Sequence, residues 1–345
     1  MTSGRYLRMV ACMVLVIAAS FILLNFLTDD FGLFWSNGPK RIWVLEKTSK
    51  YLLSYRYVPR HFEGLLIGPS HSDVGMDTRQ LQSYRVYNLS MRGSNASEVR
   101  AATVNALQRG HFRFLIICLS PYLTKDSGMK DGAISPRAYW GSLFSLLPLQ
   151  VWWQKLALHR HPELDRGNAS EWGTADTVGL TYTWDDFVEM QRAQALGLAD
   201  TRIDPRAFDD LRVVVQTARA HGVKVFGYFF PYNIWRVGTA VDSGLWASYQ
   251  AQIRTLLTNP ADVVWDMTAP EYDSFRRDAA CYTDGHLSLA GGRLVLADIE
   301  HKLRLHLDGL RQPPVFPRQE QFACLGKPGA GSGYDRAATA AAAAD

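Results

Sequence analysis

The residues from Met9 to Leu27 form one uncharged apolar run, MVACMVLVIAASFILLNFL. A helix of that length rises roughly 30 Å, which is the thickness of the hydrocarbon core of a bilayer. The run is apolar on every side, whereas a helix on the surface of a soluble domain keeps one polar face. It therefore predicts a transmembrane helix, and it restricts the rest of the chain to one side of a membrane.

The charges beside this run predict its orientation. Arg5 and Arg8 precede it, and Asp29 and Asp30 follow it. The positive-inside rule then leaves the N-terminus in the cytoplasm and the remaining chain outside it. A cleaved signal peptide is the alternative, but its apolar region is normally shorter and ends in a small-x-small site. The end of the run, FILLNFL, offers no such site, so we expect an uncleaved anchor.

Beyond the anchor, short apolar runs alternate with helical patterns. The predicted strands are 64–68, 85–89, 112–119, 223–230 and 263–266, and the predicted helices are 96–108, 205–221, 243–257 and 288–307. Asp204 is the expected N-cap of the second helix, and Gly222 its expected C′ residue. This alternation predicts an α/β fold, a three-layer α/β/α sandwich with a mainly parallel central sheet.

The expected organisation has five parts. They are a cytoplasmic N-terminus (1–8), the anchor (9–27), a stalk leading into the first helix (28–60), the folded domain (61–310) and a tail (311–345). The tail is rich in Gly and Ala, so we expect it to be disordered. A tryptophan-rich insertion at about 127–199 interrupts the alternation. Its aromatic residues could line a sugar-binding groove, rest on the bilayer surface or pack as a helical cap.

Composition excludes several classes of function. The net charge of +4 is too weak to indicate nucleic acid, and no zinc-type Cys/His spacing, P-loop or Gly-x-Gly-x-x-Gly motif is present. We therefore expect no metal, no cofactor and no nucleic-acid partner. Cys12 and Cys118 are interpreted as inert thiols, whereas Cys281 and Cys324 would pair only in an oxidising compartment.

A serine follows the first predicted strand. Residues 68–73 read GPSHSD, so Ser70 lies at the carboxyl end of a strand, where ligands bind in open α/β sheets. Serine is also common in turns and at N-caps, and the local pattern alone favours that interpretation. His286 changes the balance, because it lies between the last predicted strand and the last helix, and both segments can reach the same edge. Asp284, two residues earlier, can hold an imidazole in the tautomer that accepts a serine proton.

These pieces resemble the SGNH (GDSL-type) hydrolases. The motifs are GPS (68–70) after the first strand, NLSMRG (88–93) after the second, and DGHLS (284–288) followed by LAGG (289–292) before the last helix. The closest similarity is to membrane-anchored members that O-acetylate bacterial surface polysaccharides. Residues 29–34, DDFGLF, are similar to a motif that follows the anchor in many of those proteins. The resemblance runs in order from about residue 25 to residue 306.

The resemblance implies a flavodoxin-like SGNH hydrolase fold with acyl-transfer chemistry. In it, Ser70 matches the nucleophile, His286 the general base, and Gly93 the glycine whose backbone N–H helps to form the oxyanion hole.

Two positions depart from the family pattern. The family places its Asp three residues before the His, where this chain has Thr283. Either Asp284 still orients His286 from a tighter loop, or the serine and histidine work as a dyad. The Gly-x-Asn block of the family is also absent after the third strand. Asn233, which follows a later strand, is our candidate for the missing side-chain donor.

The function implied is a serine acyltransferase or esterase. It would act, through a Ser70 acyl-enzyme, on acetyl esters of an exopolysaccharide such as cellulose or alginate. The expected location is the bacterial inner membrane with the catalytic domain in the periplasm. The expected partners are the polysaccharide, a membrane-bound acyl exporter and a polysaccharide synthase complex. The alternative is a catalytically degenerate SGNH-like scaffold or glycan-binding subunit of such a complex, which the missing Asn block favours.

Overall fold

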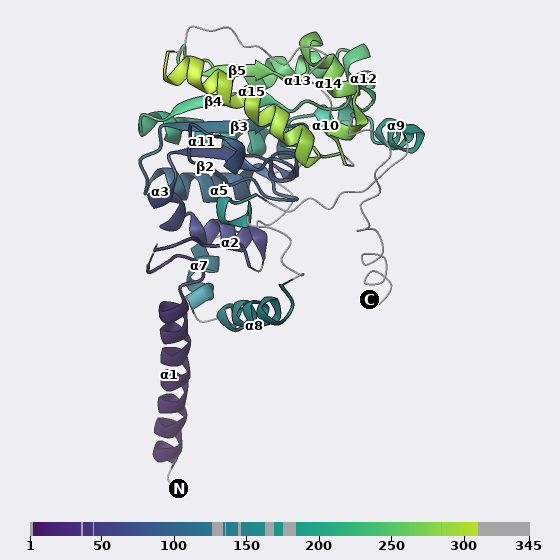
Figure 1. The fold of residues 1–345 in the computed structure, drawn as a ribbon. Helices are drawn as coiled ribbons and strands as arrows, with labels where there is room; N and C mark the ends of the chain where they lie inside the picture. Colours follow the sequence, from purple (N-terminus) through teal and green to yellow (C-terminus); the bar gives the residue numbers. More distant parts are fainter. Residues whose placement is uncertain are drawn as a thin grey trace.

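A parallel sheet of five strands forms the centre of the molecule, in the order β2-β1-β3-β4-β5 (Figure 1). The strands are β1 (Gly64–Ile67), β2 (Val86–Asn88), β3 (Phe114–Leu119), β4 (Lys224–Phe229) and β5 (Val263–Asp266). Each lies within a range that the sequence predicts as a strand, so the α/β class and the parallel sheet are confirmed. The computed structural model describes residues 3–35, 37–43, 45–125, 134, 136–143, 146–162, 169–174, 184–283 and 285–309.

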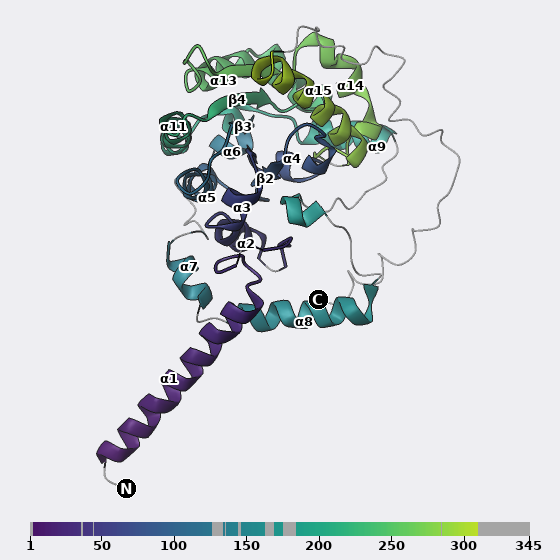
Figure 2. The same cartoon turned by 60° about the vertical axis from the view of Figure 1, so that its left-hand side comes forward.

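Helices cover both faces of this sheet, because strands such as FLIICL are apolar on both sides. Helices α5 (Ala96–Leu107) and α11 (Pro205–Ala220) pack together along one face, and α15 (Leu289–Leu307) crosses the other (Figure 2). As predicted, the Asp204 side chain caps α11 by accepting the Arg206 N–H. Gly222 follows this helix with a φ of 70°, as predicted for its C′ residue.

The connection from β4 to β5 differs from the sequence prediction. One helix is predicted over 243–257, but the structure has α12 (Ile234–Asp242) and α13 (Leu245–Arg254). Gly244 separates them with a φ of 74°, a conformation that suits glycine. Asn233 begins α12, since its side-chain oxygen accepts the Trp235 N–H at 3.1 Å.

The shorter helices fill the connections between these elements. They are α2 (Glu46–Leu53), α3 (Tyr57–His61), α4 (Ser70–Asp73), α6 (Pro121–Thr124), α10 (Leu198–Thr201), α14 (Asp273–Arg277) and the 3-10 turns η1 (Thr78–Gln80), η4 (Pro270–Tyr272) and η5 (Ala279–Cys281).

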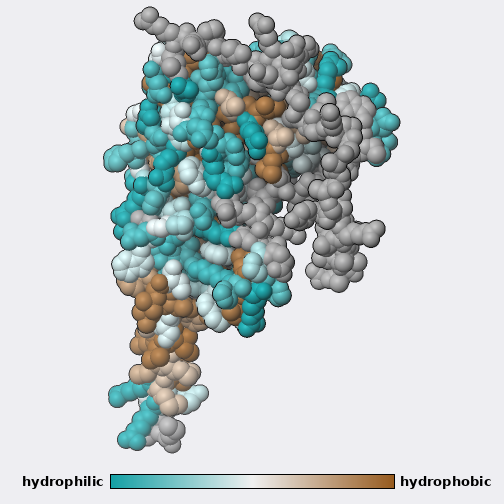
Figure 3. Space-filling model, in the orientation of Figure 1, coloured by the Kyte–Doolittle hydropathy of each residue, from teal (hydrophilic) through white to brown (hydrophobic). Residues whose placement is uncertain are grey.

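Helix α1 (Ser3–Thr28) extends away from the domain, as Figures 1 and 2 show. It contains the predicted anchor and is the one helix of the described residues that is long and apolar enough to span a membrane. In Figure 3 its surface is hydrophobic over most of its length and hydrophilic near the free end, whereas the visible face of the domain is mostly hydrophilic.

The segment after α1, which the sequence predicts as part of a stalk, instead folds against the domain. The Asp29 carboxylate accepts the backbone N–H groups of three residues, Leu33, Phe34 and Trp35, at 2.7 to 3.0 Å. Phe31 is buried in the core. Gly32 has a φ of 61°, and a Cβ there would lie 2.9 Å from Tyr57 Cβ. The acidic-aromatic motif is therefore a folded turn that ties the end of α1 to the sheet domain.

The predicted insertion at 127–199 contributes α7 (Pro136–Leu143), α8 (Leu147–Arg160), the turn η3 (Ala169–Trp172) and α9 (Trp184–Ala193). Trp172 packs on Phe62, and Phe187 of α9 packs on Tyr282, so these parts cover the domain as a cap does. Trp152 and Trp153 of α8, in contrast, are exposed. The intervening parts of the insertion and the predicted tail lie outside the described residues.

Candidate active site

Ser70 lies at the carboxyl edge of the sheet, where the chain leaves β1 and enters α4. Gly68 makes this turn possible, because a Cβ there would lie 2.6 Å from Cys118 Cβ on the neighbouring strand. The chain therefore passes close to β3 before it turns at Pro69. The side chain of Ser70 remains partly accessible to solvent.

His286 contacts this serine from the C-terminal part of the domain's sequence. Its Nε2 lies 2.9 Å from Ser70 Oγ, although the two residues are 216 positions apart. The loop that carries the histidine is closed by hydrogen bonds, since Thr283 N–H donates to the His286 carbonyl at 3.0 Å and Ser288 N–H to the Cys281 carbonyl at 2.9 Å. The predicted serine and histidine thus lie within hydrogen-bonding distance.

Glycines allow the backbone after Ser70 and the backbone around His286 to come into direct contact. A Cβ on Gly75 would lie 2.3 Å from the Leu287 carbonyl oxygen, and one on Gly292 would lie 1.7 Å from the Gly75 carbonyl oxygen. A Cβ on Gly291 would likewise lie 2.1 Å from the Cys281 carbonyl oxygen. Any larger side chain would push these segments apart. The glycines after the His-Leu-Ser sequence therefore let α15 approach the turn that follows Ser70.

The other predicted site residues are Asp284, Gly93 and Asn233. Asp284 lies outside the described residues. Gly93 is exposed with a φ of 56°, and its carbonyl accepts a hydrogen bond from Lys47 Nζ at 2.9 Å. Asn233 is buried and caps α12 through its oxygen, while its Nδ2 has no acceptor among the described residues. Within the described part of the chain, no hydrogen bond joins Gly93 or Asn233 to Ser70.

A buried ion pair lies behind the serine and was not predicted from the sequence. Lys50 of α2 and Asp73 of α4 both have fully buried side chains, with Lys50 Nζ 2.5 Å from Asp73 Oδ1. Lys50 also donates to the Ser90 carbonyl, and Glu46 lies 3.2 Å away from its ammonium. Burial raises the pKa of Asp73 to about 6, against the opposing attraction of Lys50. This pair ties the helix that begins at Ser70 to α2.

Side-chain bonds connect the same helix to the segment after β2. Ser72 Oγ donates to Ser90 Oγ at 2.8 Å, and Asn88 Nδ2 donates to the Ser72 carbonyl at 2.6 Å. Asn88 Oδ1 also accepts the Ser90 N–H at 3.1 Å. The NLSMRG motif therefore fixes the position of α4, independently of any role of its glycine.

His71, next to the serine, lies in an aromatic environment. Its ring centroid is 4.9 Å from that of Tyr122, 4.7 Å from Phe230 and 5.1 Å from Tyr232. The His286 ring is 5.4 Å away. His71 is only 3% exposed, so it supports the ring of His286 from the interior of the domain.

Arg236 is a second buried cation beside the histidine loop. Its Nη2 donates to Tyr122 Oη at 2.8 Å, whereas Nε and Nη1 have no acceptor among the described residues. A Cβ on Gly285 would lie 2.1 Å from Nη1. The guanidinium therefore lies against the residue that precedes His286, and a larger residue there would displace it.

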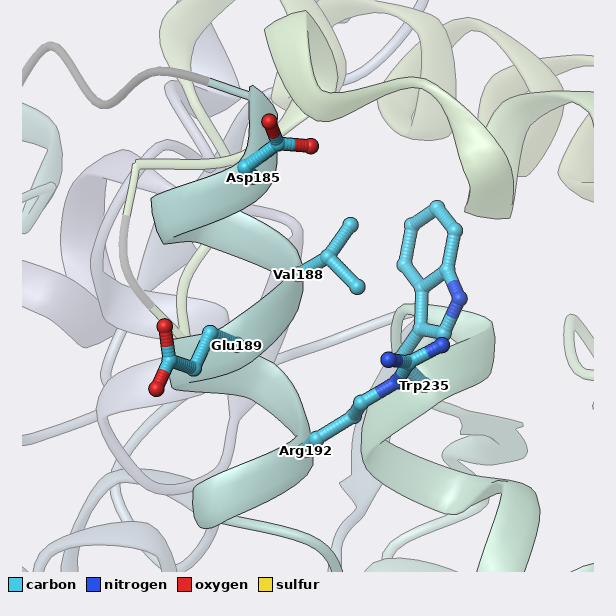
Figure 4. Close-up of a pocket in the computed structure, with 5 residues that line it drawn as sticks. All are labelled: Asp185, Val188, Glu189, Arg192 and Trp235. Atoms are coloured by element: carbon cyan, nitrogen blue, oxygen red, sulfur yellow. The ribbon is translucent and has the colours of Figure 1, made fainter.

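A pocket of about 460 Å³ lies between α9 and α12 (Figure 4). It is lined by Asp185, Val188, Glu189 and Arg192 of α9 and by Trp235 of α12. Figure 4 shows Trp235 on one side of the pocket and the side chains of α9, Arg192 among them, on the other. The pocket therefore combines an apolar ring with charged hydrogen-bonding groups.

The thiols are not candidates for chemistry at this edge. Burial raises the pKa of Cys118 to about 12, so the thiol stays protonated, in agreement with its interpretation as inert. Cys281 is buried, and Cys324 lies outside the described residues. Among the residues that the structure describes, no group of three or more His, Cys, Asp or Glu side chains is placed to hold a metal ion.

The positions of Lys50 and Arg236 beside the site are not predicted from the sequence. A lysine in the pattern EKTSKYLL is usually a solvent-exposed residue, and the arginine lies in a helix that was not predicted. No protein-family model matches the chain, and no curated protein matches it either. The candidate site therefore rests on its geometry.

Proposed function

We propose that this chain is a serine esterase or acyltransferase of the SGNH type that acts on acyl esters. The observation that carries the proposal is the 2.9 Å contact between Ser70 Oγ and His286 Nε2. A serine hydroxyl becomes a useful nucleophile when an adjacent imidazole accepts its proton, and this distance permits that transfer. The position at the carboxyl edge of a parallel sheet supports the proposal, since ligands bind at this edge.

In the first half of the reaction, Ser70 Oγ attacks the ester carbonyl carbon while His286 Nε2 takes the serine proton. The tetrahedral oxyanion needs hydrogen-bond donors. The backbone N–H groups of Ser70 and Gly93 are the proposed donors, and neither has an acceptor within the described residues. The imidazolium then protonates the leaving alcohol, and an acyl-serine remains.

In the second half, His286 removes a proton from the acceptor, which attacks the acyl-serine and regenerates the Ser70 hydroxyl. Water as acceptor gives an esterase, and a sugar hydroxyl gives a transferase. The pocket beside Trp235 supports a carbohydrate acceptor, because an indole face can stack on a sugar ring while Asp185, Glu189 and Arg192 bond to hydroxyl groups. An acetylated exopolysaccharide such as cellulose or alginate is the proposed substrate class.

The proposed location follows from α1. With α1 across the bacterial inner membrane and Arg5 and Arg8 on the cytoplasmic side, the domain lies in the periplasm. That compartment contains exported polysaccharide. A membrane-bound acyl exporter and a polysaccharide synthase complex are the proposed partners there.

A fluorophosphonate probe and an acetyl ester such as 4-nitrophenyl acetate test the chemistry. We expect the probe to label Ser70 in the full-length protein, and Ser70→Ala and His286→Ala to lower the turnover of the ester by at least roughly 10³-fold. Ser243→Ala, which changes a serine at the surface end of α12, is the control and should leave both readouts unchanged. Labelling of another residue, or equal turnover in all variants, would overturn the proposal.

The second candidate is a non-enzymatic glycan-binding subunit. It is favoured by the segment after β3, where Ser120 Oγ is bonded to Tyr232 Oη at 2.6 Å in place of the Asn block of the family. Binding of an acetylated polymer that persists in Ser70→Ala but is lost in Trp235→Ala, without any acyl-enzyme seen by mass spectrometry, would support this function. An acyl adduct on Ser70 would exclude it.

A further inference from the structure

Helix α8 occupies the side of the domain from which α1 emerges. In Figures 1 and 2 it begins next to the end of α1 and is the outermost element of the domain on that side. The element just before α8 is bonded to α1, since Asn25 Nδ2 donates to the carbonyls of Ser142 and Leu143 at the end of α7 at 3.3 and 3.1 Å. Asp30, just after α1, is paired with Lys155 of α8. Helix α8 therefore lies at the level where the apolar helix ends.

The outer face of α8 is apolar and exposed. Leu146, Leu149 and Trp153 are 57%, 43% and 64% exposed, and Leu156 and Arg160 continue the same stripe at helical spacing. The opposite face is the buried one, with Pro148 and Val151. Trp152 is also exposed and stacks on Trp153 at 5.5 Å. We call the outer face, from Leu146 to Arg160, the α8 stripe.

The stripe has the composition of a helix that lies on a membrane. Tryptophan prefers the layer between lipid tails and water, and basic residues attract anionic lipid headgroups. Arg160 lies at the end of the stripe, and α8 contains no acidic residue. A shallow groove of about 430 Å³ follows the stripe, lined by Trp153, Leu156 and Arg160 among others.

We propose that the α8 stripe lies in the headgroup layer of the membrane that α1 crosses, with Trp153 turned toward the lipid tails. The inference rests on the proposed insertion of α1 and goes beyond the proposed chemistry. A bilayer is favoured over a protein partner as the occupant because α1 already brings this surface to the bilayer, and because tryptophan and arginine without acidic residues match an anionic lipid surface. The domain is then held to the membrane at two points, which fixes its orientation.

A photoactivatable phospholipid tests the proposal on the full-length protein. The protein is reconstituted into vesicles of phosphatidylethanolamine and phosphatidylglycerol that contain a lipid with a diazirine in its acyl chain, and adducts are mapped by mass spectrometry. We expect adducts on α1 and on residues 146–160, with none on α11, which lies on the sheet domain. Adducts on α1 without any on α8 would overturn the proposal. Absence of adducts on α1 would instead refute the anchor, so the two failures are distinguishable.

Variants identify the surface responsible. The double variant Leu149→Glu/Trp153→Glu should lose the adducts on α8 while those on α1 remain. Val213→Glu is the matched control, because Val213 is a 38% exposed apolar side chain on α11. It should leave the pattern unchanged. Unfolding temperatures equal to that of the wild type would show that all variants are folded. If α8 carries no lipid adduct and the double variant converts a dimer into a monomer, the stripe is a protein interface and the membrane proposal is wrong.

Discussion

Two lysine–aspartate pairs join separate segments of this molecule, and they differ in their exposure to water. Lys50 and Asp73 are fully buried behind the candidate serine. Lys155 and Asp30 join α8 to the segment just after α1, with the lysine side chain 40% exposed and the aspartate side chain only 5% exposed. A buried charge that loses its partner is strongly destabilising, whereas a pair is weakened when one member is partly solvated by water. The segment that carries Ser70 is therefore held by a fully buried ion pair, whereas α8 is held by an ion pair that water partly reaches.

The largest effect is expected from Lys50→Met. It leaves the Asp73 carboxylate buried without its ammonium, so the free energy of unfolding should fall by about 3–5 kcal/mol. Chemical unfolding of the full-length protein in nanodiscs measures this. The double variant Lys50→Met/Asp73→Leu should recover most of the loss, because no charge remains buried. A double variant as unstable as the single one would show that the loss comes from packing.

Two glycine substitutions compare how tightly the backbone is packed next to the candidate site and in α7. Gly292→Ala places a methyl group against the Gly75 carbonyl, and we expect a loss of about 1–3 kcal/mol together with a lower rate of ester turnover. Gly141→Ala in α7 is the matched variant, because a Cβ there meets no atom within 4 Å. It should stabilise the protein by up to about 1 kcal/mol. Equal effects on unfolding temperature would contradict the proposed close contact at Gly292.

The third prediction concerns pH and the buried pair. The pKa of Asp73 is raised to about 6 by burial, above the value of about 3.9 of an unfolded aspartate. Its contribution to stability is therefore fully present below pH ~4 and is lost as the pH rises through about 6. Asp73→Asn does not titrate, so the wild type should lose stability relative to this variant across that window, by roughly 2–4 °C per kcal/mol. A pH-independent difference between the two unfolding curves would refute the raised pKa.

A smaller effect is expected from Lys155→Met, the same substitution at a pair whose lysine is partly exposed. It should lower the free energy of unfolding by less than Lys50→Met does, because water already reaches the Lys155 ammonium. Comparison with Lys50→Met by the same unfolding measurement is direct, because only the surroundings of the lysine differ. A loss as large as that of Lys50→Met would show that the α8 attachment is as essential as the interior pair.

The sheet could be predicted because its strands are short apolar runs between helical patterns, and nothing else in the chain competes with that pattern. The contact of Ser70 with His286 could be predicted for a topological reason, since both follow strands of one parallel sheet. The burial of Lys50 could not be predicted, because it depends on partners that are distant in sequence. The sequence predicts a stalk around Asp29 because the partners of its carboxylate are likewise known only from the fold. Its three N–H donors are a property of the folded turn, which charge alone does not indicate.

The contact between Ser70 and His286 also has a consequence for the order of events during synthesis. The serine follows shortly after the anchor, while the histidine and α15 are among the last folded parts of the described chain. Until α15 docks on the turn at Gly75, the serine has no proton acceptor. A chain that stalls before that point during synthesis therefore carries a serine without its histidine, and the proposed acyl-transfer activity would begin only in domains that have folded completely.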